Sequence, residues 1–283
     1  MIPTEFEYSR ATSLDDALAK LKAANGDGKL LAGGHSLIPL MKLRLSEPKV
    51  LIDIARIPGL AGIREKGGQI EVGAATTHHE VATSALLRDR CPVLAEAAAE
   101  IGDPQVRNRG TVGGSLAHAD PSADYPAVVL ALDAEIDVKG PNGARTIKAS
   151  GFFQDLFTVD LQLHEIIVAM RFAPVRQAAY AKLHQRASHY AIVGVAAALE
   201  VAGGVITSAR IGLTGAGPSA VRLTKVEQAL AGKPATKEAV SAATAQAGAD
   251  VANLNADLHA SEEYRRAMIP VFTKRAVEAA LAR

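Results

Sequence analysis

The first residues of the chain alternate between helix-like and strand-like patterns. Apolar positions recur at helical spacing over residues 14–21, directly after Ser13, whose hydroxyl can cap the free backbone N–H groups. Asn25-Gly26 ends this predicted helix. Residues 29–32 form a short apolar strand that runs into a glycine pair, and residues 37–41 begin a second helix. The order is therefore helix, strand, glycine turn, helix.

The same alternation continues and then changes near Pro174. The first half adds predicted strands at residues 50–54, 69–74, 135–138 and 145–148, and a predicted helix at 92–101. After a strand at 165–172, the second half has two long strands, 190–201 and 205–213, joined by Gly203-Gly204, and then helices at 236–249 and 261–281. We expect Pro270 to interrupt the last helix.

This change in pattern predicts two domains. The first, residues 1–174, is of the α/β (α+β) class because strands and helices alternate, and it divides into subdomains of about 1–55 and 56–174. The second, residues 175–283, has an antiparallel sheet followed by helices.

Composition excludes several classes of partner. Of 283 residues, 48% are hydrophobic and 22% charged, which is the profile of a soluble globular protein. The 31 basic and 30 acidic residues leave a net charge of +1, so we expect no broad basic surface for nucleic acid. The apolar stretch at 190–199 is too short to span a membrane, and residues 1–7 carry acids where a signal peptide needs bases. We therefore expect a mature cytoplasmic protein with no transmembrane segment.

Cys91 is the one cysteine of the chain. It cannot form an intramolecular disulfide, nor supply the ligands of a zinc or iron–sulfur centre by itself. We expect no metal bound by this chain.

Two glycine-rich loops, at residues 32–36 and 110–115, are the strongest candidates for a binding site. Paired glycines allow a close backbone approach, and successive N–H groups can form a concave nest for phosphate oxygens. Two such loops fit the pyrophosphate of a dinucleotide gripped from both sides, although each alone could be a plain turn. Neither loop matches the Gly-x-Gly-x-x-Gly fingerprint or a P-loop.

Other candidate residues are weaker. His78-His79-Glu80 contains metal-ligand types, but its spacing fits no standard site, so solvated or helix-start roles are favoured. The spacing of His118 and Asp120 also fits no standard metal site, so solvated or helix-start roles are favoured for them too. Asp124 could accept hydrogen bonds from ribose hydroxyls or could simply begin a helix. Arg107 and Arg109 could face phosphate or water, and no motif of a serine or cysteine hydrolase is present.

Together, these residues resemble a known family: the FAD-binding medium subunit of molybdenum hydroxylases, the carbon monoxide dehydrogenase and xanthine dehydrogenase group. The resemblance rests on the motif at residues 32–39, on the motif at 111–115 followed by Asp120-Pro121 and Asp124, and on the length. It spans essentially the whole chain and is closest in format to the carbon monoxide dehydrogenase branch. It implies a two-subdomain FAD-binding fold of the vanillyl-alcohol-oxidase/PCMH type, followed by a small C-terminal domain.

The resemblance also implies which residues contact FAD, and no residue with a catalytic role of its own. Lys182 is placed near the flavin N1–C2=O edge, where a cation would raise the reduction potential. Tyr190 is either an aromatic over the ring or a half-buried strand tyrosine. The residues carried over are Ala32, Gly33, Gly34, His35, Ser36, Ile101, Gly102, Val106, Gly110, Thr111, Gly113, Gly114, Ser115, Asp124, Ile166, Ile167, Lys182 and Tyr190.

A chain without iron–sulfur ligands must receive electrons from a neighbour that has them. The family implies a large subunit with a molybdenum cofactor and a small subunit with two [2Fe–2S] clusters, in a doubled heterotrimer. FAD would pass the electrons to an external acceptor. The complex is expected in the cytoplasm, either free or associated with the membrane at its periphery.

Two alternatives remain. One is a stand-alone FAD-dependent oxidase of the same fold, with flavin attached at His35, and the other is a non-catalytic nucleotide-binding adaptor.

Overall fold

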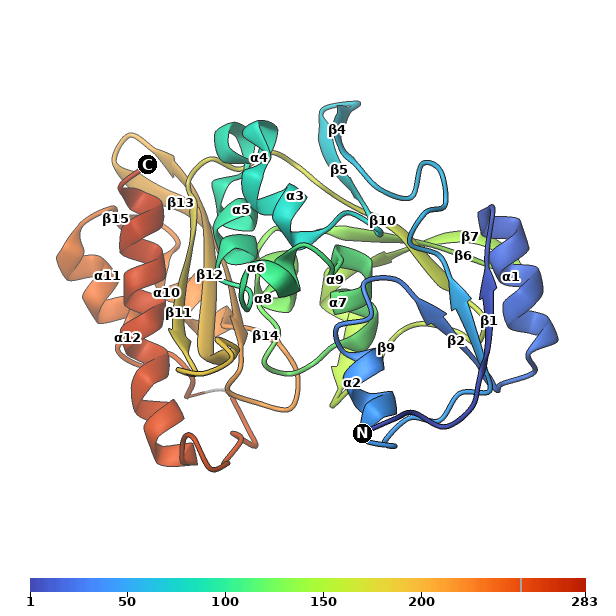
Figure 1. Cartoon of the computed structure of the whole chain (residues 1–283). Coiled ribbons are helices and arrows are strands. Elements are labelled where there is room, and N and C mark those ends of the chain that lie inside the picture. Colours follow the sequence, from blue (N-terminus) through green and yellow to red (C-terminus); the bar gives the residue numbers. More distant parts are fainter. Residues whose placement is uncertain (250) are drawn as a thin grey trace.

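The computed structural model describes residues 1–249 and 251–283. Three larger sheets follow one another across the molecule, from the N-terminal strands to the C-terminal sheet at the opposite end (Figure 1), and a fourth sheet has two short strands. Among the described residues, no helix has the length and apolar character needed to cross a bilayer.

The N-terminal subdomain is a small parallel sheet with two helices. Its strand order is β1-β3-β2, and both pairings are parallel. The predicted helix cap is confirmed, because the Ser13 hydroxyl accepts a hydrogen bond from the Asp16 N–H. The elements are β1 (Glu7–Arg10), α1 (Leu14–Ala23), β2 (Gly28–Leu31), α2 (Leu37–Lys42) and β3 (Val50–Asp53).

The second subdomain is built on a five-stranded antiparallel sheet of order β4-β5-β10-β6-β7. The long connection between β5 and β6 is helical, and a small hairpin precedes β10. The strands are β4 (Ile63–Lys66), β5 (Gln69–Gly73), β6 (Glu135–Gly140), β7 (Gly143–Lys148), β8 (Phe153–Asp155), β9 (Thr158–Val159) and β10 (Ile166–Phe172). The helices are α3 (His78–Thr83), α4 (Ala85–Arg90), α5 (Pro92–Ala99), α6 (Pro104–Arg107), α7 (Val112–His118), α8 (Tyr125–Ala131) and α9 (Ala149–Phe152).

The C-terminal region is an antiparallel sheet of order β11-β12-β13-β14, with β15 pairing on β13. The predicted hairpin is confirmed: Gly203 and Gly204 both have positive φ, at 57° and 77°. The strands are β11 (Ala178–His184), β12 (Ala191–Ala202), β13 (Val205–Thr214), β14 (Val221–Arg222) and β15 (Lys233–Pro234). The helices are α10 (Thr224–Leu230), α11 (Lys237–Thr244) and α12 (Glu262–Leu281).

Two helix predictions in this region differ from the structure, one in an expected interruption and the other in its bounds. Pro270 does not interrupt α12, which runs unbroken from Glu262 to Leu281. Proline removes only the bond to the carbonyl of Arg266, and this residue is exposed, so water can satisfy that oxygen. The helix predicted over 236–249 is shorter, because Thr236 is its N-cap and α11 ends at Thr244.

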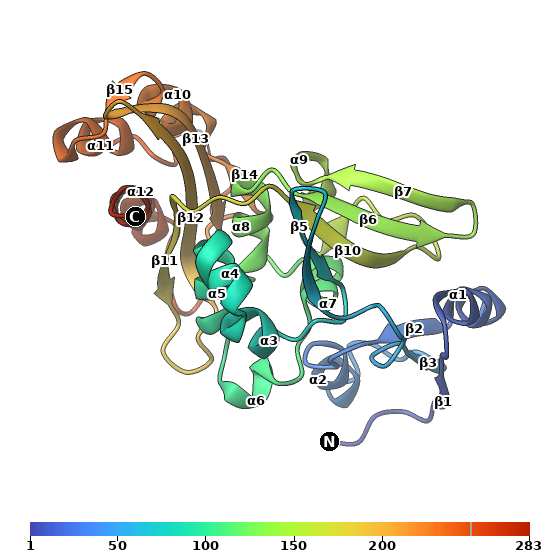
Figure 2. The same ribbon diagram turned by 90° about the horizontal axis from the view of Figure 1, so that it is seen from above.

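The C-terminal sheet is buried on both faces. Along β12, Val193, Val195 and Ala197 belong to the core shared with α12, whereas Ala196 and Ala198 belong to the core of the preceding subdomain. Figure 2 shows the sheet between α12 on one side and α5 and α8 on the other. Burial on both faces explains why the strand reads as a continuous apolar run, and it joins the two cores firmly.

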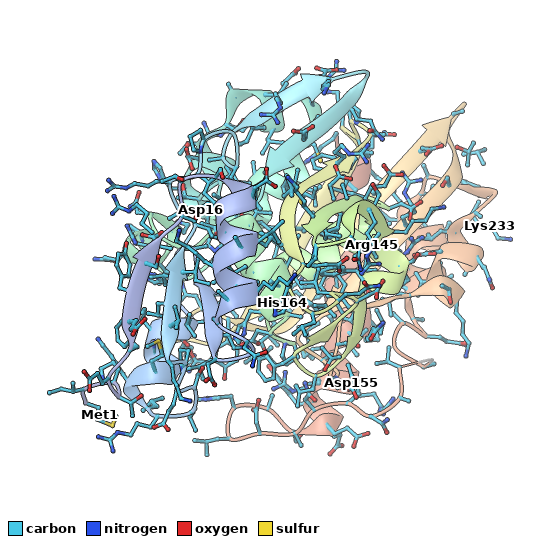
Figure 3. The ribbon with its side chains drawn as sticks, turned by 90° about the vertical axis from the view of Figure 1, so that its right-hand side faces the viewer. Met1, Asp16, Arg145, Asp155, His164 and Lys233 are labelled. Carbon is cyan, nitrogen blue, oxygen red and sulfur yellow. The ribbon has the colours of Figure 1, made fainter. Side chains whose placement is uncertain are left out.

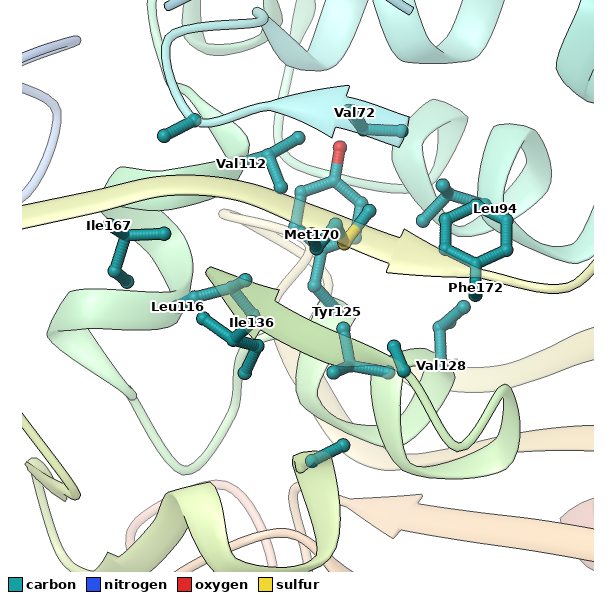
Figure 4. Close-up of a cluster of buried hydrophobic side chains, with 14 of the residues drawn as sticks. Val72, Leu94, Val112, Leu116, Tyr125, Val128, Ile136, Ile167, Met170 and Phe172 are labelled. Carbon is teal, nitrogen blue, oxygen red and sulfur yellow. The ribbon is translucent and has the colours of Figure 1, made fainter. Parts of the chain in front are cut away.

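The larger core lies between the second sheet and its helices. Tyr125, Met170 and Phe172 are almost completely buried in it and gather in one cluster (Figure 4). Tyr125 begins α8, whereas the other two lie on β10, so this core fixes α8 against the central strand of the sheet.

Arg265 is a buried cation inside the C-terminal core. Its side chain is 1% exposed, and its Nη1 donates to the carbonyls of Ile192 and Gly215 at 2.6 and 2.8 Å. Its Nη2 lies 2.5 Å from Asp257 Oδ2. The arginine therefore ties α12 to β12 and to the segment after β13.

Replacement of this arginine should destabilise the protein. Arg265→Met leaves two carbonyls without their donor, and we expect the free energy of unfolding to fall by about 3 kcal/mol in urea denaturation. Arg266→Met is the matched control, since Arg266 pairs with Glu262 at the surface and should cost less than about 0.5 kcal/mol. Equal losses in the two variants would contradict this role.

Candidate functional site: a cleft between two glycine loops

A cleft of about 1070 Å³ lies where the N-terminal subdomain meets the rest of the chain. Its volume is that of a site for a large cofactor rather than for a small metabolite. It is lined by residues from all three regions of the fold, mainly in the segments 28–37, 101–106, 110–124, 161–167 and 188–190.

The two glycine loops meet across this cleft, backbone against backbone. The first follows β2, whereas the second consists of Gly110, Thr111 and the first turn of α7, which begins at Val112. A Cβ atom at Gly33 would overlap the carbonyl oxygen of Arg109 and lie 2.8 Å from the Cα of Gly110. Only glycine permits such an approach at residue 33, so the two loops form one joint wall.

The first loop supplies free amide groups. Among the hydrogen bonds formed by the described residues, none uses the backbone N–H of residues 33–36. Gly34 has a φ of +76°, a left-handed conformation that turns the chain at this point. A run of unpaired N–H groups at the rim of a cleft is a nest for anionic oxygens, as the sequence predicts.

The second loop differs from this prediction. Gly113 N–H donates to the Ala74 carbonyl at 2.8 Å, and Gly114 N–H donates to the Thr111 hydroxyl at 3.2 Å. The expectation that this loop also offers a row of free N–H groups was wrong for these residues, because the amides bond Ala74, directly after β5, and the capping hydroxyl of Thr111. The second loop shapes the cleft more than it donates to it.

His78 lies beneath the second loop at the start of α3, which is the helix-start role that the sequence favours, and it is buried rather than solvated. Its side chain lines the cleft but is buried, and its Nδ1 is 3.2 Å from the Tyr125 hydroxyl. A Cβ atom at Gly110 would lie 2.5 Å from His78 Nε2. Burial lowers the pKa of His78 to about 4, with the nearby charges of His35 and Arg107 acting in the same direction. The imidazole is therefore neutral at pH 7.

The neighbouring candidates have structural roles. Glu80 forms a capping box with Thr77 at the start of α3. Asp120 lines the cleft and accepts a hydrogen bond from Ser122 N–H. Over the described part of the chain, no group of three or more His, Cys, Asp or Glu side chains could hold a metal ion.

Asp124 is the buried carboxylate of the cleft. It lines the cavity, and both the Tyr180 hydroxyl, at 2.6 Å, and Lys182 Nζ, at 2.7 Å, contact its Oδ1 atom. Burial raises the pKa of Asp124 to about 6, although Lys182 and Tyr180 act in the opposite direction. Asp124 is the N-cap residue of α8, but its side chain makes no capping hydrogen bond, so the helix-start role does not account for that side chain.

Lys182 lies behind the cavity wall. Its side chain is 2% exposed, pairs with Asp124 and donates to the Glu100 carbonyl at 2.9 Å. It is not among the residues that line the cleft, whereas the family resemblance implies a position beside the flavin edge. The other residues predicted for the site all line the cavity: Ala32, Gly33, Gly34, His35, Ser36, Ile101, Gly102, Val106, Gly110, Thr111, Gly113, Gly114, Ser115, Asp124, Ile166, Ile167 and Tyr190.

The two arginines beside the second loop do not act alike. Arg107 Nη1 donates to the carbonyls of Ile101 and Gly102, both at 2.9 Å, and so fixes the turn after α5. Arg109 contributes its backbone carbonyl to the contact with Gly33. Neither guanidinium belongs to the cavity wall.

Arg145 is a residue that the sequence analysis missed. It projects from β7 and donates from Nε and Nη2 to the two carboxylate oxygens of Glu165, both at 2.8 Å. It also bonds the carboxylate and the carbonyl of Asp160. These bonds hold the segment 161–167, which lines the cleft and includes His164. Arg145 and His164 are both labelled in Figure 3. No local sequence signal links residue 145 to residue 165, because the pair depends on strand pairing.

The contact between the loops gives a prediction for stability. In Gly33→Ala, the new methyl group would press on the Arg109 backbone, and we expect a loss of about 1–3 kcal/mol in the free energy of unfolding. Gly151→Ala is the control, because a Cβ there meets nothing within 4 Å. An unchanged urea midpoint for Gly33→Ala would show that the loops can separate freely.

The Arg145–Glu165 pair gives a prediction for pH dependence. Hydrogen bonds from Arg145 lower the pKa of Glu165 below its ordinary 4.5. A carboxylate with a lowered pKa stabilises the fold above the ordinary value, and this stabilisation disappears as the pH falls through the folded pKa. Glu165→Gln should therefore cost about 1–2 kcal/mol at pH 7, and the difference from wild type should shrink below pH 4.5.

Urea denaturation at several pH values measures this difference. Glu262→Gln removes a carboxylate from an exposed pair and serves as the control, with a cost below about 0.5 kcal/mol. A gap between Glu165→Gln and wild type that is independent of pH would refute the assignment.

Comparisons with known proteins agree with this architecture. Residues 4–174 match the FAD binding domain in molybdopterin dehydrogenase, and residues 178–280 match the CO dehydrogenase flavoprotein C-terminal domain. The carbon monoxide dehydrogenase medium chain of Hydrogenophaga pseudoflava is 43% identical over 100% of this chain and 99% of its own length. The 6-hydroxypseudooxynicotine dehydrogenase complex subunit alpha of Paenarthrobacter nicotinovorans is 37% identical, over 100% of this chain and 97% of its own.

A solved structure shows the same fold. A chain of the carbon monoxide dehydrogenase from Hydrogenophaga pseudoflava, in a form that lacks the Mo-pyranopterin moiety of the molybdenum cofactor, superposes with a TM-score of 0.95 at 44% identity and covers 100% of this chain and 99% of its own. The fold and family predicted from the sequence are confirmed. The chain therefore belongs to the FAD-binding medium subunits of the molybdenum hydroxylases, the oxidoreductase family that includes carbon monoxide dehydrogenase and xanthine dehydrogenase.

Proposed function

We propose that this chain holds FAD in the cleft and passes electrons from a partner subunit to an external acceptor, in a complex of the aerobic carbon monoxide dehydrogenase type. The observation that carries the proposal is the nest of unpaired amides at residues 33–36, which lines the same cleft as the buried Asp124. Bound flavin would supply the electron-carrying chemistry, which the side chains of the cleft lack.

The cleft residues would bind the cofactor by distinct means. The amides of residues 33–36 would hold the pyrophosphate oxygens, and Asp124 would accept hydrogen bonds from hydroxyl groups of the cofactor. Apolar side chains at Ile101, Val106 and Ile167 would exclude water from the ring. Neutral His78 supports the wall from beneath and adds no charge at pH 7.

The residues of this chain support the relay role, because they offer no site for an iron–sulfur cluster within the part that the structure describes. Cys91 is completely buried, and burial raises the pKa of its thiol to about 12, so it is not a ready thiolate ligand. Within the described residues, no other cluster could hold a metal. Electrons would therefore come from a small subunit with [2Fe–2S] clusters and a large subunit with the molybdenum cofactor, in a (large-medium-small)2 assembly in the cytoplasm. In such an assembly this chain would divide into a FAD-binding domain, residues 1–174, and a C-terminal flavoprotein domain, residues 175–283.

A stand-alone oxidase remains the second candidate because His35 lies on the cleft wall, where its Nδ1 is 3.2 Å from the Gly33 carbonyl. In that case His35 would carry the flavin covalently, and the chain would oxidise a small substrate without partners.

Native purification separates these candidates. We expect the chain to copurify with a cysteine-rich iron–sulfur subunit and a large molybdenum subunit, with FAD, iron and molybdenum in the preparation. Acid precipitation should release the flavin into the supernatant. A lone yellow protein that is reduced by a small substrate, with colour retained in the acid pellet, would refute the relay and support attachment at His35.

A further inference from the structure

Tyr180 and Lys182 belong to the C-terminal region and do not line the cleft, but both contact Asp124, which does. They lie two residues apart on β11, so their side chains are on the same face of the sheet. Both bond the same oxygen, Asp124 Oδ1, at 2.6 and 2.7 Å. None of the described residues forms a hydrogen bond to Asp124 Oδ2. One oxygen of the carboxylate is therefore anchored, and the other remains for a ligand in the cavity.

The surroundings of this group show a specific fit. Gly194 on β12 pairs with Lys182, and a Cβ atom there would overlap the Tyr180 hydroxyl. A glycine in the middle of a buried strand thus makes room for that hydroxyl. Lys182 also donates to the carbonyl of Glu100, the C-cap of α5, where a cation is favoured by the helix dipole.

We propose that Tyr180 and Lys182 are positioning residues, which hold Asp124 as an oriented hydrogen-bond acceptor for a hydroxyl group of the bound cofactor. This inference rests on the proposed binding of FAD. It differs from a direct contact between Lys182 and the flavin ring, because the cation acts through the carboxylate. Removal of either anchor would leave Asp124 free to turn away from the ligand or to take up a proton.

A double-mutant cycle on the apo form of the full chain distinguishes the two roles. FAD affinity is measured by flavin fluorescence for Lys182→Met, Asp124→Asn and the combination of both. Each single variant should weaken binding about 10-fold or more, as expected for loss of a charge-assisted bond. The double variant should bind as Asp124→Asn does, because Lys182 then has nothing to position.

Two further measurements complete the cycle. Tyr180→Phe removes only a hydroxyl group, so it replaces Lys182→Met in the same cycle if the latter does not fold. Tyr264→Phe, on the exposed face of α12, is the matched control and should bind FAD as wild type does. If the loss of FAD affinity in the double variant equals the product of the losses in the two single variants, Lys182 acts independently of Asp124 and the proposal is overturned.

The pH profile of binding tests positioning against a merely structural role. The titratable groups that face Asp124 are Lys182, Tyr180, Glu100 and Tyr125. Loss of the lysine cation raises the pKa of Asp124 further, so Asp124 takes up a proton at a higher pH. As the pH is lowered, FAD binding by Lys182→Met should therefore begin to weaken at a higher pH than FAD binding by wild type. An unshifted profile contradicts the proposal. Failure of wild type to bind FAD at any pH refutes the proposed function instead.

Discussion

The contact between Gly33 and the backbone of Arg109 is the constraint on which the cleft depends. It brings a loop after a parallel strand against a loop before α7, more than seventy residues later, with no side chain between them. The amides of the second loop bond the segment directly after β5, at Ala74 and Thr76, and so fix this wall of the cleft in place. The first loop rests on that wall and keeps its own amides free for a ligand.

The C-terminal sheet contributes to the same cleft because both of its faces are buried. One face packs on α12, and the other packs on the preceding core through residues such as Ala196 and Ala198. This second face brings β11 to the start of α8 and so joins Tyr180 and Lys182 to Asp124. The C-terminal region therefore contributes to the cleft directly, because two of its side chains bond the buried carboxylate of Asp124.

The sequence predicted much of the fold and less of the hydrogen bonding. Local signals sufficed for α1, with its Ser13 cap, and for the Gly203-Gly204 hairpin, because each depends on neighbouring residues. The paired glycines marked both walls of the cleft, but the pattern could not show which loop uses its amides internally. Contacts of the Arg145–Glu165 kind depend on pairing between distant strands and have no local signal.

The polarity of the cleft sets the direction in which a long ligand can bind. Residues 33–36 present N–H donors at one wall, while Asp124 presents an acceptor at another. His78 is neutral, and the positive charge of Lys182 is directed to Asp124 rather than into the cavity. A ligand with anionic oxygens in one part and hydroxyl donors in another satisfies both walls in one orientation, whereas the reversed ligand would set anionic oxygens against a carboxylate. Under the proposed function, the placement of these donors and of this acceptor would favour one orientation of the ligand.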